Sequence, residues 1–181
     1  MKVNLKNYNN NGYIPGNKLK IIFWYYINIL FIKSYFFPWS RLKIFFLKLF
    51  GAKIGKRVII KPGVNVKYPW KLEIGDDCWI GENVWIDNLD FVKISKNVCI
   101  SQGSLLICGN HNYKKSSFDL VLGPITIEEG VWICAKSVVC QNTILHSHSI
   151  LLSGSVLTSD MQKFCIYRGN PATKIKNREI N

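Results

Sequence analysis

The chain has 181 residues, 48% hydrophobic and 19% charged, a composition that fits one domain with a buried core and excludes a disordered tail or a collagen-like fibre. The net charge is +13, but residues 1–72 carry fourteen Lys and Arg residues and no acid, whereas residues 73–181 carry ten bases and eleven acids. The basic character therefore belongs to the N-terminal part of the chain.

Two helices are predicted in the basic N-terminal segment, residues 1–53, on either side of Pro38. The first, about residues 18–33, is apolar nearly all round and rich in aromatic residues. The second begins near Ser40 and ends at Gly51, a residue typical of helix C-caps. Helical spacing gives this second helix one apolar face, made of Leu42, Phe45, Phe46, Leu49 and Phe50.

Two roles are open for these helices. They either cap the open end of the following fold, burying their aromatic residues there or against a neighbouring subunit, or they lie on a membrane. Bases without an acid, beside an aromatic amphipathic surface, match a helix on anionic lipid. Because the basic residues form no dense tract, nucleic acid is not an expected partner.

The longest charge-free apolar stretch, residues 21–32, is shorter than the roughly 18 to 20 residues that span a bilayer. It also does not fit a signal peptide, so we expect a cytoplasmic protein, in peripheral contact with the inner membrane face if the membrane alternative holds. Six scattered cysteines without a C-x-x-C pair predict reduced, structural thiols and no disulfides.

A six-residue repeat begins at Ile54. Aliphatic residues recur every sixth position in groups of three, and extra residues occur only between groups, with fifteen of them before Ile127. The fifteen aliphatic positions are Ile54, Ile60, Val66, Ile74, Ile80, Ile86, Ile94, Ile100, Leu106, Ile127, Ile133, Val139, Leu145, Leu151 and Leu157. Four positions after most of them stands a small or β-branched residue: Val58, Val64, Cys78, Val84, Val98, Ser104, Val131, Ser137, Thr143, Ser149 and Ser155.

A period of six fits neither a helix nor a long strand, so each hexad is a short strand plus a corner, and three hexads close a triangular coil. We predict a mainly β protein, a parallel β-helix of about five coils over residues 54–162. Loop 107–124 is inserted at one corner, and residues 163–181 form a C-terminal tail. The aliphatic residues point inward, and the coils stack at roughly 4.8 Å.

Several further motifs accompany the repeat. They are Tyr13-x-Pro15-Gly16, Lys61-Pro62, Lys67-Tyr68-Pro69-Trp70, Trp85-Ile86-Asp87-Asn88-Leu89, Cys99-Ile100-Ser101-Gln102-Gly103, Gly109-Asn110-His111-Asn112-Tyr113 and Gly169-Asn170-Pro171-Ala172. With the repeat, they resemble the hexapeptide-repeat acyltransferases, and among these the colanic-acid-type acetyltransferases of bacterial exopolysaccharide biosynthesis. The resemblance implies a left-handed β-helix, a homotrimer with clefts between subunits, and acetyl-CoA as co-substrate.

The inserted loop holds one histidine, His111. A long loop in so regular a fold is commonly functional, and removing a hydroxyl proton requires a group whose pKa is ordinarily near neutrality, as that of histidine is. The resemblance implies that His111 is the general base, and the alternative is an ordinary solvated loop histidine. We interpret His146 and His148 as surface strand residues. Their spacing with His111 differs from that of γ-carbonic-anhydrase-like zinc sites, so no metal is predicted.

Asp87, Asn88 and Asp90 follow the strand one coil earlier, on the corner that bears the insertion. Asp90 interrupts the column of small residues, so we expect its side chain to turn out of the core. The resemblance implies that acidic and amide residues here bind the acceptor sugar. The alternative is a polar corner that caps a turn.

The chain has no glycine-rich phosphate loop of the Rossmann or P-loop type. The resemblance instead implies that acetyl-CoA lies in a groove between coils of adjacent subunits. The implied contacts are Trp132, Ala135, Ser153, Thr158, Arg168 and Lys174, the last in place of a basic residue that the family often has directly after Pro-Ala, where Thr173 stands. For Trp132 and Arg168 the alternative is ordinary surface packing.

These expectations describe an acetyl-CoA-dependent O-acetyltransferase that acts on a sugar or lipid-linked saccharide. His111 removes the hydroxyl proton, and the oxygen attacks the thioester directly in a ternary complex. One alternative is a xenobiotic or amino-sugar N-acetyltransferase of the same fold, and a second is a non-enzymatic β-helix scaffold.

Overall fold

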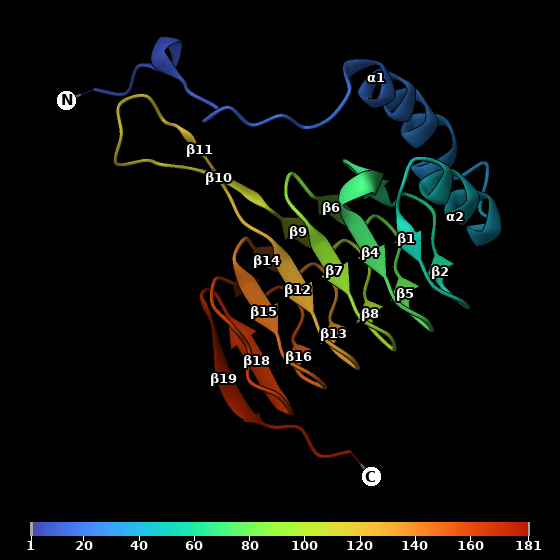
Figure 1. The fold of residues 1–181 in the computed structure, drawn as a ribbon. Coiled ribbons are helices and arrows are strands. Elements are labelled where there is room, and N and C mark those ends of the chain that lie inside the picture. The colour runs from blue at the N-terminus through green and yellow to red at the C-terminus, as the bar shows by residue number, and fades with distance from the viewer. Residues whose placement is uncertain (1, 181) are drawn as a thin grey trace.

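The structure is a computed structural model that describes residues 2–180 (Figure 1). Its main body is a β-solenoid with three parallel sheets, and two helices lie across the end where the solenoid begins. Before them runs an arm, residues 2–17, with one 3-10 turn, η1 (Leu5–Asn7). The helical elements are α1 (Lys18–Ile27), the π-helical segment η2 (Asn28–Ile32) and α2 (Ser40–Leu49).

Each sheet takes one strand from each coil. Sheet A contains β1 (Lys53–Ile54), β4 (Leu72–Ile74), β7 (Val92–Ile94), β12 (Ile125–Ile127) and β15 (Thr143–Leu145). Sheet B contains β2 (Ile59–Ile60), β5 (Trp79–Ile80), β8 (Cys99–Ile100), β13 (Trp132–Ile133), β16 (Ile150–Leu151), β18 (Cys165–Gly169) and β19 (Ala172–Asn177). Sheet C contains β3 (Asn65–Val66), β6 (Trp85–Asp87), β9 (Leu105–Ile107), β14 (Val138–Cys140) and β17 (Val156–Leu157). A further 3-10 turn, η3 (Pro69–Lys71), joins the first two coils.

The strand register confirms the repeat. Ile54 pairs with Ile74 and Ile74 with Ile94, one coil above the next, and the other two columns align in the same way. All fifteen aliphatic residues are buried, and so are the eleven small residues four positions later. The core is therefore a stack of aliphatic layers, closed at the corners by small side chains.

The corners contain a third column that the sequence analysis missed. The residue three positions after most aliphatic ones has a positive φ, a conformation that favours Gly and Asn. Gly63, Gly103, Gly130 and Gly154 occupy it in four corners. Arg57, Asp77, Asn83, Asn97, Lys136, Asn142 and His148 occupy it in others. Neither histidine expected on a strand lies on one: His146 follows the end of β15, and His148 is a corner residue whose ring stacks on that of Phe164 at 4.8 Å.

The helices cap the first coil and satisfy its exposed edge strands. Trp24 Nε1 donates to Val66 O at 2.8 Å, and Ser40 Oγ both accepts from Ile60 N at 3.0 Å and donates to Ile60 O at 3.1 Å. An uncovered first coil would offer these groups to another chain. Gly51, with φ +102°, ends α2 through bonds from Gly51 N to Lys48 O and from Ala52 N to Leu47 O, as predicted for a C-cap.

The predicted apolar face of the second helix was wrong in part: Leu42, Phe46 and Phe50 are partly buried, but the other two residues are not. Phe45 and Leu49 are 59% and 65% exposed, whereas Lys43 and Leu47 are fully buried. The reason is a cluster of carbonyl groups at the end of η2: Lys43 Nζ donates to Phe31 O (3.0 Å), Ile32 O (2.6 Å) and Ser34 O (3.3 Å). Binding them turns the Lys43 side of the helix inward.

The expected C-terminal tail contains two strands. β18 continues sheet B in parallel beside β16, and β19 returns antiparallel beside β18. Five coils are therefore complete, and β18 begins a sixth. All six cysteines are free. Within residues 2–180, no helix has both the length and the apolar character needed to cross a membrane.

Candidate active site

The inserted loop forms a β-hairpin at the corner between sheets C and A. Strand β10 (Gly109–His111) pairs antiparallel with β11 (Leu120–Leu122), and His111 lies opposite Leu120. The turn between them is closed by a bond from Asn112 N to Asp119 O at 2.8 Å and by an ion pair of 3.0 Å between Lys115 and Asp119. His111 therefore stands on an ordered strand that projects from the prism (Figure 1).

The ring of His111 is oriented by its neighbours. Its Nδ1 lies 3.0 Å from Phe118 O, and the ring stacks on that of Phe118 at 4.3 Å with an interplanar angle of 10°. Because a carbonyl oxygen only accepts hydrogen bonds, this contact favours the tautomer with the proton on Nδ1. Nε2 is then the nitrogen with a free lone pair.

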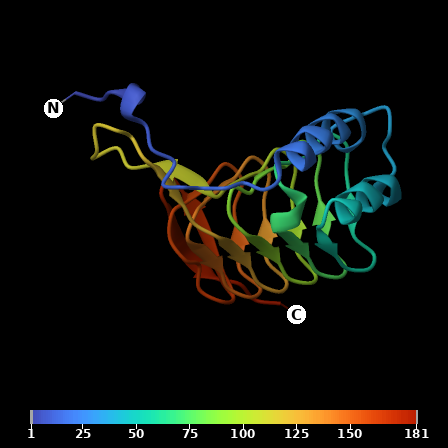
Figure 2. The same ribbon diagram turned by 45° about the horizontal axis from the view of Figure 1, so that its top comes forward.

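The N-terminal arm packs along the hairpin, and the two segments lie side by side in both ribbon views (Figure 2). Asn4 N donates to Ser116 O at 2.8 Å, Leu120 N donates to Asn9 O at 3.0 Å, and Asn11 Nδ2 donates to Leu120 O at 2.8 Å. Tyr8 meets the His111 ring edge-on, with centroids 5.8 Å apart. This support was not predictable from the sequence, since residues 2–12 show neither periodicity nor a recognisable motif.

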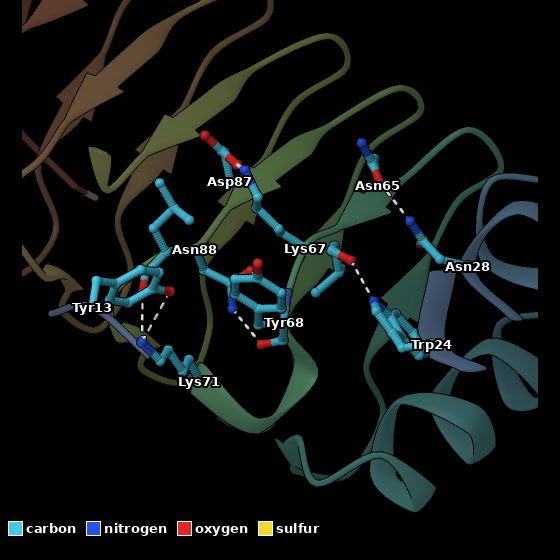
Figure 3. Close-up of polar contacts among 11 residues, drawn as sticks. Tyr13, Trp24, Asn28, Asn65, Lys67, Tyr68, Lys71, Asp87 and Asn88 are labelled. Atoms are coloured by element: carbon cyan, nitrogen blue, oxygen red, sulfur yellow. Dashed lines mark hydrogen bonds and ion pairs between the residues drawn. The ribbon is translucent and has the colours of Figure 1, made fainter. Parts of the chain in front are cut away.

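The arm is anchored beside the acidic corner (Figure 3). Tyr13 Oη donates to Leu89 O at 2.6 Å, and Lys71 Nζ donates to the same oxygen at 2.6 Å while lying 4.6 Å from the Tyr13 ring centroid. Burial raises the pKa of Tyr13, so its phenol remains a hydrogen-bond donor. Further along the arm, Trp70 Nε1 donates to Pro15 O at 2.8 Å.

The three expected acceptor residues have different surroundings. Asp87 forms an ion pair with Lys67, whose Nζ lies 2.9 Å from the buried Oδ1. Asn88 is fully buried, and its amide accepts from Tyr68 N at 2.9 Å and donates to Tyr68 O at 2.6 Å. Asp90 is half-buried and accepts from Phe91 N at 2.7 Å. Asn88 thus holds the corner together, whereas Asp87 is a partly exposed carboxylate paired with Lys67.

The corner and the hairpin are joined directly. Asp87 pairs with Ile107 in sheet C, and Cys108 N donates to Asp87 O at 3.2 Å, one residue before β10. The structure therefore brings Asp87, Asp90 and the base of the His111 hairpin to one edge of the prism.

Most of the expected donor residues lie on sheet B or along its edge with sheet C. Trp132 projects from sheet B, is 43% exposed, and donates from Nε1 to Ser101 Oγ at 2.9 Å. Ala135 and Ser153 occupy stacked corners, since Gly154 N donates to Ala135 O. Arg168 follows on β18, and Lys174 pairs opposite Tyr167 on β19. Thr158 is separate from these, because it follows β17 on the edge between sheets C and A.

A cavity of about 430 Å³ lies on the outer face of sheet B beside Ser101. Its walls include Trp79, Cys99 and Gln102. Among residues 2–180, no three His, Cys, Asp or Glu side chains are close enough together to hold a metal ion.

Comparison with known proteins supplies the family. No family model matches the chain. It is 33% identical over 172 residues to the protein assigned as the colanic acid biosynthesis acetyltransferase WcaF of Escherichia coli (strain K12), covering 92% of each chain. It is 28% identical over 138 residues to the galactoside O-acetyltransferase of the same strain, covering 75% of this chain and 67% of that protein.

Solved structures share the fold. The hexapeptide-repeat acetyltransferase VCA0836 of Vibrio cholerae, complexed with acetyl coenzyme A, superposes with a TM-score of 0.81 at 17% identity, over 90% of this chain and 89% of that one. A galactoside acetyltransferase in complex with coenzyme A gives a TM-score of 0.79 at 22% identity, over 89% and 82%. With the hexad repeat and the near full-length similarity to WcaF, the chain belongs to the hexapeptide-repeat acetyltransferases.

Proposed function

We propose that the protein is an acetyl-CoA-dependent O-acetyltransferase that modifies a sugar hydroxyl in the biosynthesis of a bacterial surface polysaccharide. The observation that carries this proposal is the orientation of His111. Its Nδ1 is bonded to Phe118 O, so Nε2 keeps a free lone pair with which to accept a proton, on a paired strand of the hairpin. The similarity to WcaF and to galactoside O-acetyltransferase supports a sugar as the acceptor.

The reaction is a direct acyl transfer. His111 Nε2 takes the proton of the acceptor hydroxyl as that oxygen attacks the thioester carbonyl. The resulting tetrahedral adduct expels the sulfur of coenzyme A, and the imidazolium returns the proton to the departing thiolate. The Phe118 carbonyl keeps the ring in place during this step.

The chain's own cysteines support transfer without an acetyl-enzyme. Cys108 directly precedes the hairpin, and burial raises its pKa to about 12, so it is a neutral thiol at physiological pH. Burial also raises the pKa values of Cys99, Cys134 and Cys140. A thiolate nucleophile is therefore not expected at this site.

On the acceptor side, we assign the sugar contact to Asp87. Its carboxylate is partly exposed at the corner, where the Lys67 ammonium holds it at 2.9 Å, and a carboxylate in this place can accept a hydrogen bond from a sugar hydroxyl. Asp90 is a second, half-exposed carboxylate on the same corner. Asn88 keeps both amide groups on Tyr68, so we give it the role of stabilising the corner.

On the donor side, we assign the pantetheine arm to the edge between sheets B and C, with Trp132 near the thioester. Ala135, Ser153 and Arg168 follow one another along this edge, and Lys174 lies on the next strand. His111, by contrast, lies across sheet C, at its edge with sheet A. A complete site therefore forms between two chains, with the hairpin of one facing the donor edge of its neighbour.

The outer faces of the prism fit a homotrimer. Sheet A points Lys53, Glu73, Lys93 and Thr126 to solvent, with a 2.6 Å ion pair between Lys53 and Glu73. The other two sheets carry apolar rows. Sheet B presents Ile59, Trp79, Cys99 and Trp132, and sheet C presents Trp85, Leu105, Val138 and Val156. Two apolar faces on each chain provide one contact for each of two neighbours in a closed ring.

The test is an acceptor screen with the purified full chain and acetyl-CoA. Thiol release and product mass are measured with nucleotide sugars, oligosaccharides, amino sugars and aminated drugs. We expect a sugar ester that mild alkali removes. An alkali-stable amide would favour the N-acetyltransferase alternative, and absence of coenzyme A binding by calorimetry would favour a scaffold without chemistry.

A further inference from the structure

The helical end of the molecule exposes a large apolar surface. Although α1, η2 and α2 already cap the solenoid, their outer sides and the turn between them remain uncovered. This surface, called here the helical patch, consists of Leu19, Ile22, Phe23, Tyr25, Tyr26, Ile29, Leu30, Tyr35, Phe36, Trp39, Phe45 and Leu49, each 43% to 82% exposed. Contiguous exposed apolar surface of this kind on a protein normally marks an interaction site.

Part of the helical patch is a regular helix face. Trp24, Asn28 and Ile32 point into the core, whereas Ile22, Phe23, Tyr26 and Leu30 recur at helical spacing on the outside. The first helical segment is therefore apolar on two opposite faces, and only one of them has a partner within the chain.

Aromatic contacts connect three members of the patch, Phe36, Trp39 and Phe45, through partly buried rings between them. Phe45 contacts Phe46 at 5.4 Å, Phe46 stacks on Phe31 at 4.5 Å, and Phe31 contacts Phe37 at 5.2 Å. Phe37 in turn meets Phe36 at 5.0 Å and Trp39 at 6.3 Å. These contacts join α2, η2 and the intervening turn into one surface at one end of the solenoid (Figure 1).

Exposed bases flank the helical patch. Lys18, Lys33, Arg41 and Lys48 are exposed and form no ion pair within the described part of the chain, and residues 1–72 contain no acid. Lys43, on the same helix as Arg41 and Lys48, is fully buried against backbone carbonyls and does not contribute. The patch thus combines aromatic residues with uncompensated positive charge.

We propose that the helical patch docks on an anionic lipid bilayer, with its aromatic residues at the headgroup boundary and its bases on lipid phosphates. A second copy seated on the same surface would bring two sets of bases together without an acid between them, which disfavours self-association there. In the proposed trimer, three such patches lie at the same end of parallel prisms and bind one membrane together. Docking itself does not depend on acetyl transfer.

The experiment is co-sedimentation of the full chain with vesicles at low and high salt. One set of vesicles contains phosphatidylcholine alone, and the other mixes it with phosphatidylglycerol. We expect binding to the anionic vesicles at low salt, and weaker binding at high salt or without phosphatidylglycerol. A protein that stays in the supernatant with anionic vesicles, or pellets equally with neutral ones, overturns the proposal.

Matched variants identify the surface. In the double variant Phe23→Ser/Phe36→Ser, the affinity for anionic vesicles should fall on the order of tenfold or more, because two large apolar side chains no longer enter the interface. Phe91→Ser, which removes a 55% exposed aromatic residue far from the helices, should bind like the unchanged chain. Similarly, Lys18→Glu/Lys48→Glu should weaken binding, whereas Lys93→Glu on sheet A should not.

Sedimentation velocity and thermal unfolding of each variant separate lipid binding from folding and assembly. If the patch variants keep their mass and unfolding temperature but lose vesicle binding, the proposal holds. If they change the oligomer mass and leave vesicle binding unchanged, the patch is a subunit contact and the proposal is wrong.

Discussion

Tyr8 contacts the ring of His111, the proposed general base, in an edge-on arrangement. The His111 ring lies between Phe118, which stacks on it, and Tyr8, which meets it at an angle of 61°. Aromatic contacts of this kind contribute about 0.5 to 1.5 kcal/mol beyond area burial. Because Tyr8 contacts the imidazole ring, we assign it as a positioning residue, whose loss should weaken the proton transfer and leave substrate binding intact.

We therefore expect Tyr8→Ala to lower kcat by about two- to tenfold with an unchanged KM for acetyl-CoA, as the contact energy converts at 1.4 kcal/mol per tenfold. Tyr8→Phe keeps the ring and should restore the rate. Tyr113→Ala, which removes a 76% exposed ring from the same hairpin, serves as control. If kcat stays low in Tyr8→Phe as well, the effect belongs to the hydroxyl group, and the role of the ring is contradicted.

Lys43 binds three carbonyl groups in a buried place, so its charge has a structural role. Replacing it with Met leaves the carbonyls of Phe31, Ile32 and Ser34 without this donor, and we expect the free energy of unfolding to fall by about 2 to 3 kcal/mol. The exposed Lys48→Met on the same helix should change it by less than about 0.5 kcal/mol. Denaturant titration of both variants measures the difference, and equal effects would contradict the structural role.

At the scale of elements, the arm acts as a support for the hairpin. Backbone bonds of Asn4 and Asn9 tie it to Ser116 in the turn and to Leu120 on β11, and Tyr13 fixes its far end to Leu89. A two-stranded hairpin alone has marginal order in water. The arm therefore supplies the third segment that keeps His111 in place.

Deleting residues 2–10 should loosen the hairpin and spare the prism. In native-state hydrogen exchange, we expect amides of β10 and β11 to exchange on the order of tenfold faster or more, while amides of β14 in the same sample keep their rates. Acetyl transfer should fall at least as far as in Tyr8→Ala. Unchanged exchange in β10 and β11 would contradict the supporting role of the arm.

The repeat was predictable because each hexad repeats one packing environment, so Ile54 and its equivalents reveal both the strands and their register. The buried face of α2 was not predictable. Helical periodicity counts Lys43 as polar and cannot detect the carbonyls of η2 that bind it. Within the site, the motif around His111 was recognisable. The contact of Tyr8 with His111 was not recognisable, because the two residues are 103 positions apart and no local sequence pattern encodes such a contact.

At the scale of the whole molecule, the three faces of the prism differ in polarity, and this difference predicts how chains associate. Trp79 is 60% exposed in the middle of the apolar row of sheet B, whereas Ile144 is 37% exposed on the polar sheet A. If neighbouring chains cover sheet B, a charge at Trp79 is buried without a partner, and a charge at Ile144 remains in water.

Trp79→Lys should accordingly shift the mass in solution from a trimer toward a monomer and abolish most acetyl transfer, since a single chain holds only half of the proposed site. Ile144→Lys should remain trimeric and active. Analytical ultracentrifugation with parallel rate measurements tests both. A fully active monomeric Trp79→Lys would contradict a site shared between chains.

The central claim is that His111 is the general base, and one pair of variants tests it most directly. In His111→Asn, kcat should fall by about 10² to 10⁴, while coenzyme A affinity by calorimetry and the unfolding temperature stay close to those of the unchanged chain. In His148→Asn, the same replacement at a corner with φ +59°, where Asn is well accommodated, the rate should be nearly unchanged. Retention of more than roughly a third of the rate by His111→Asn would contradict the assignment, because removing a general base costs far more than that.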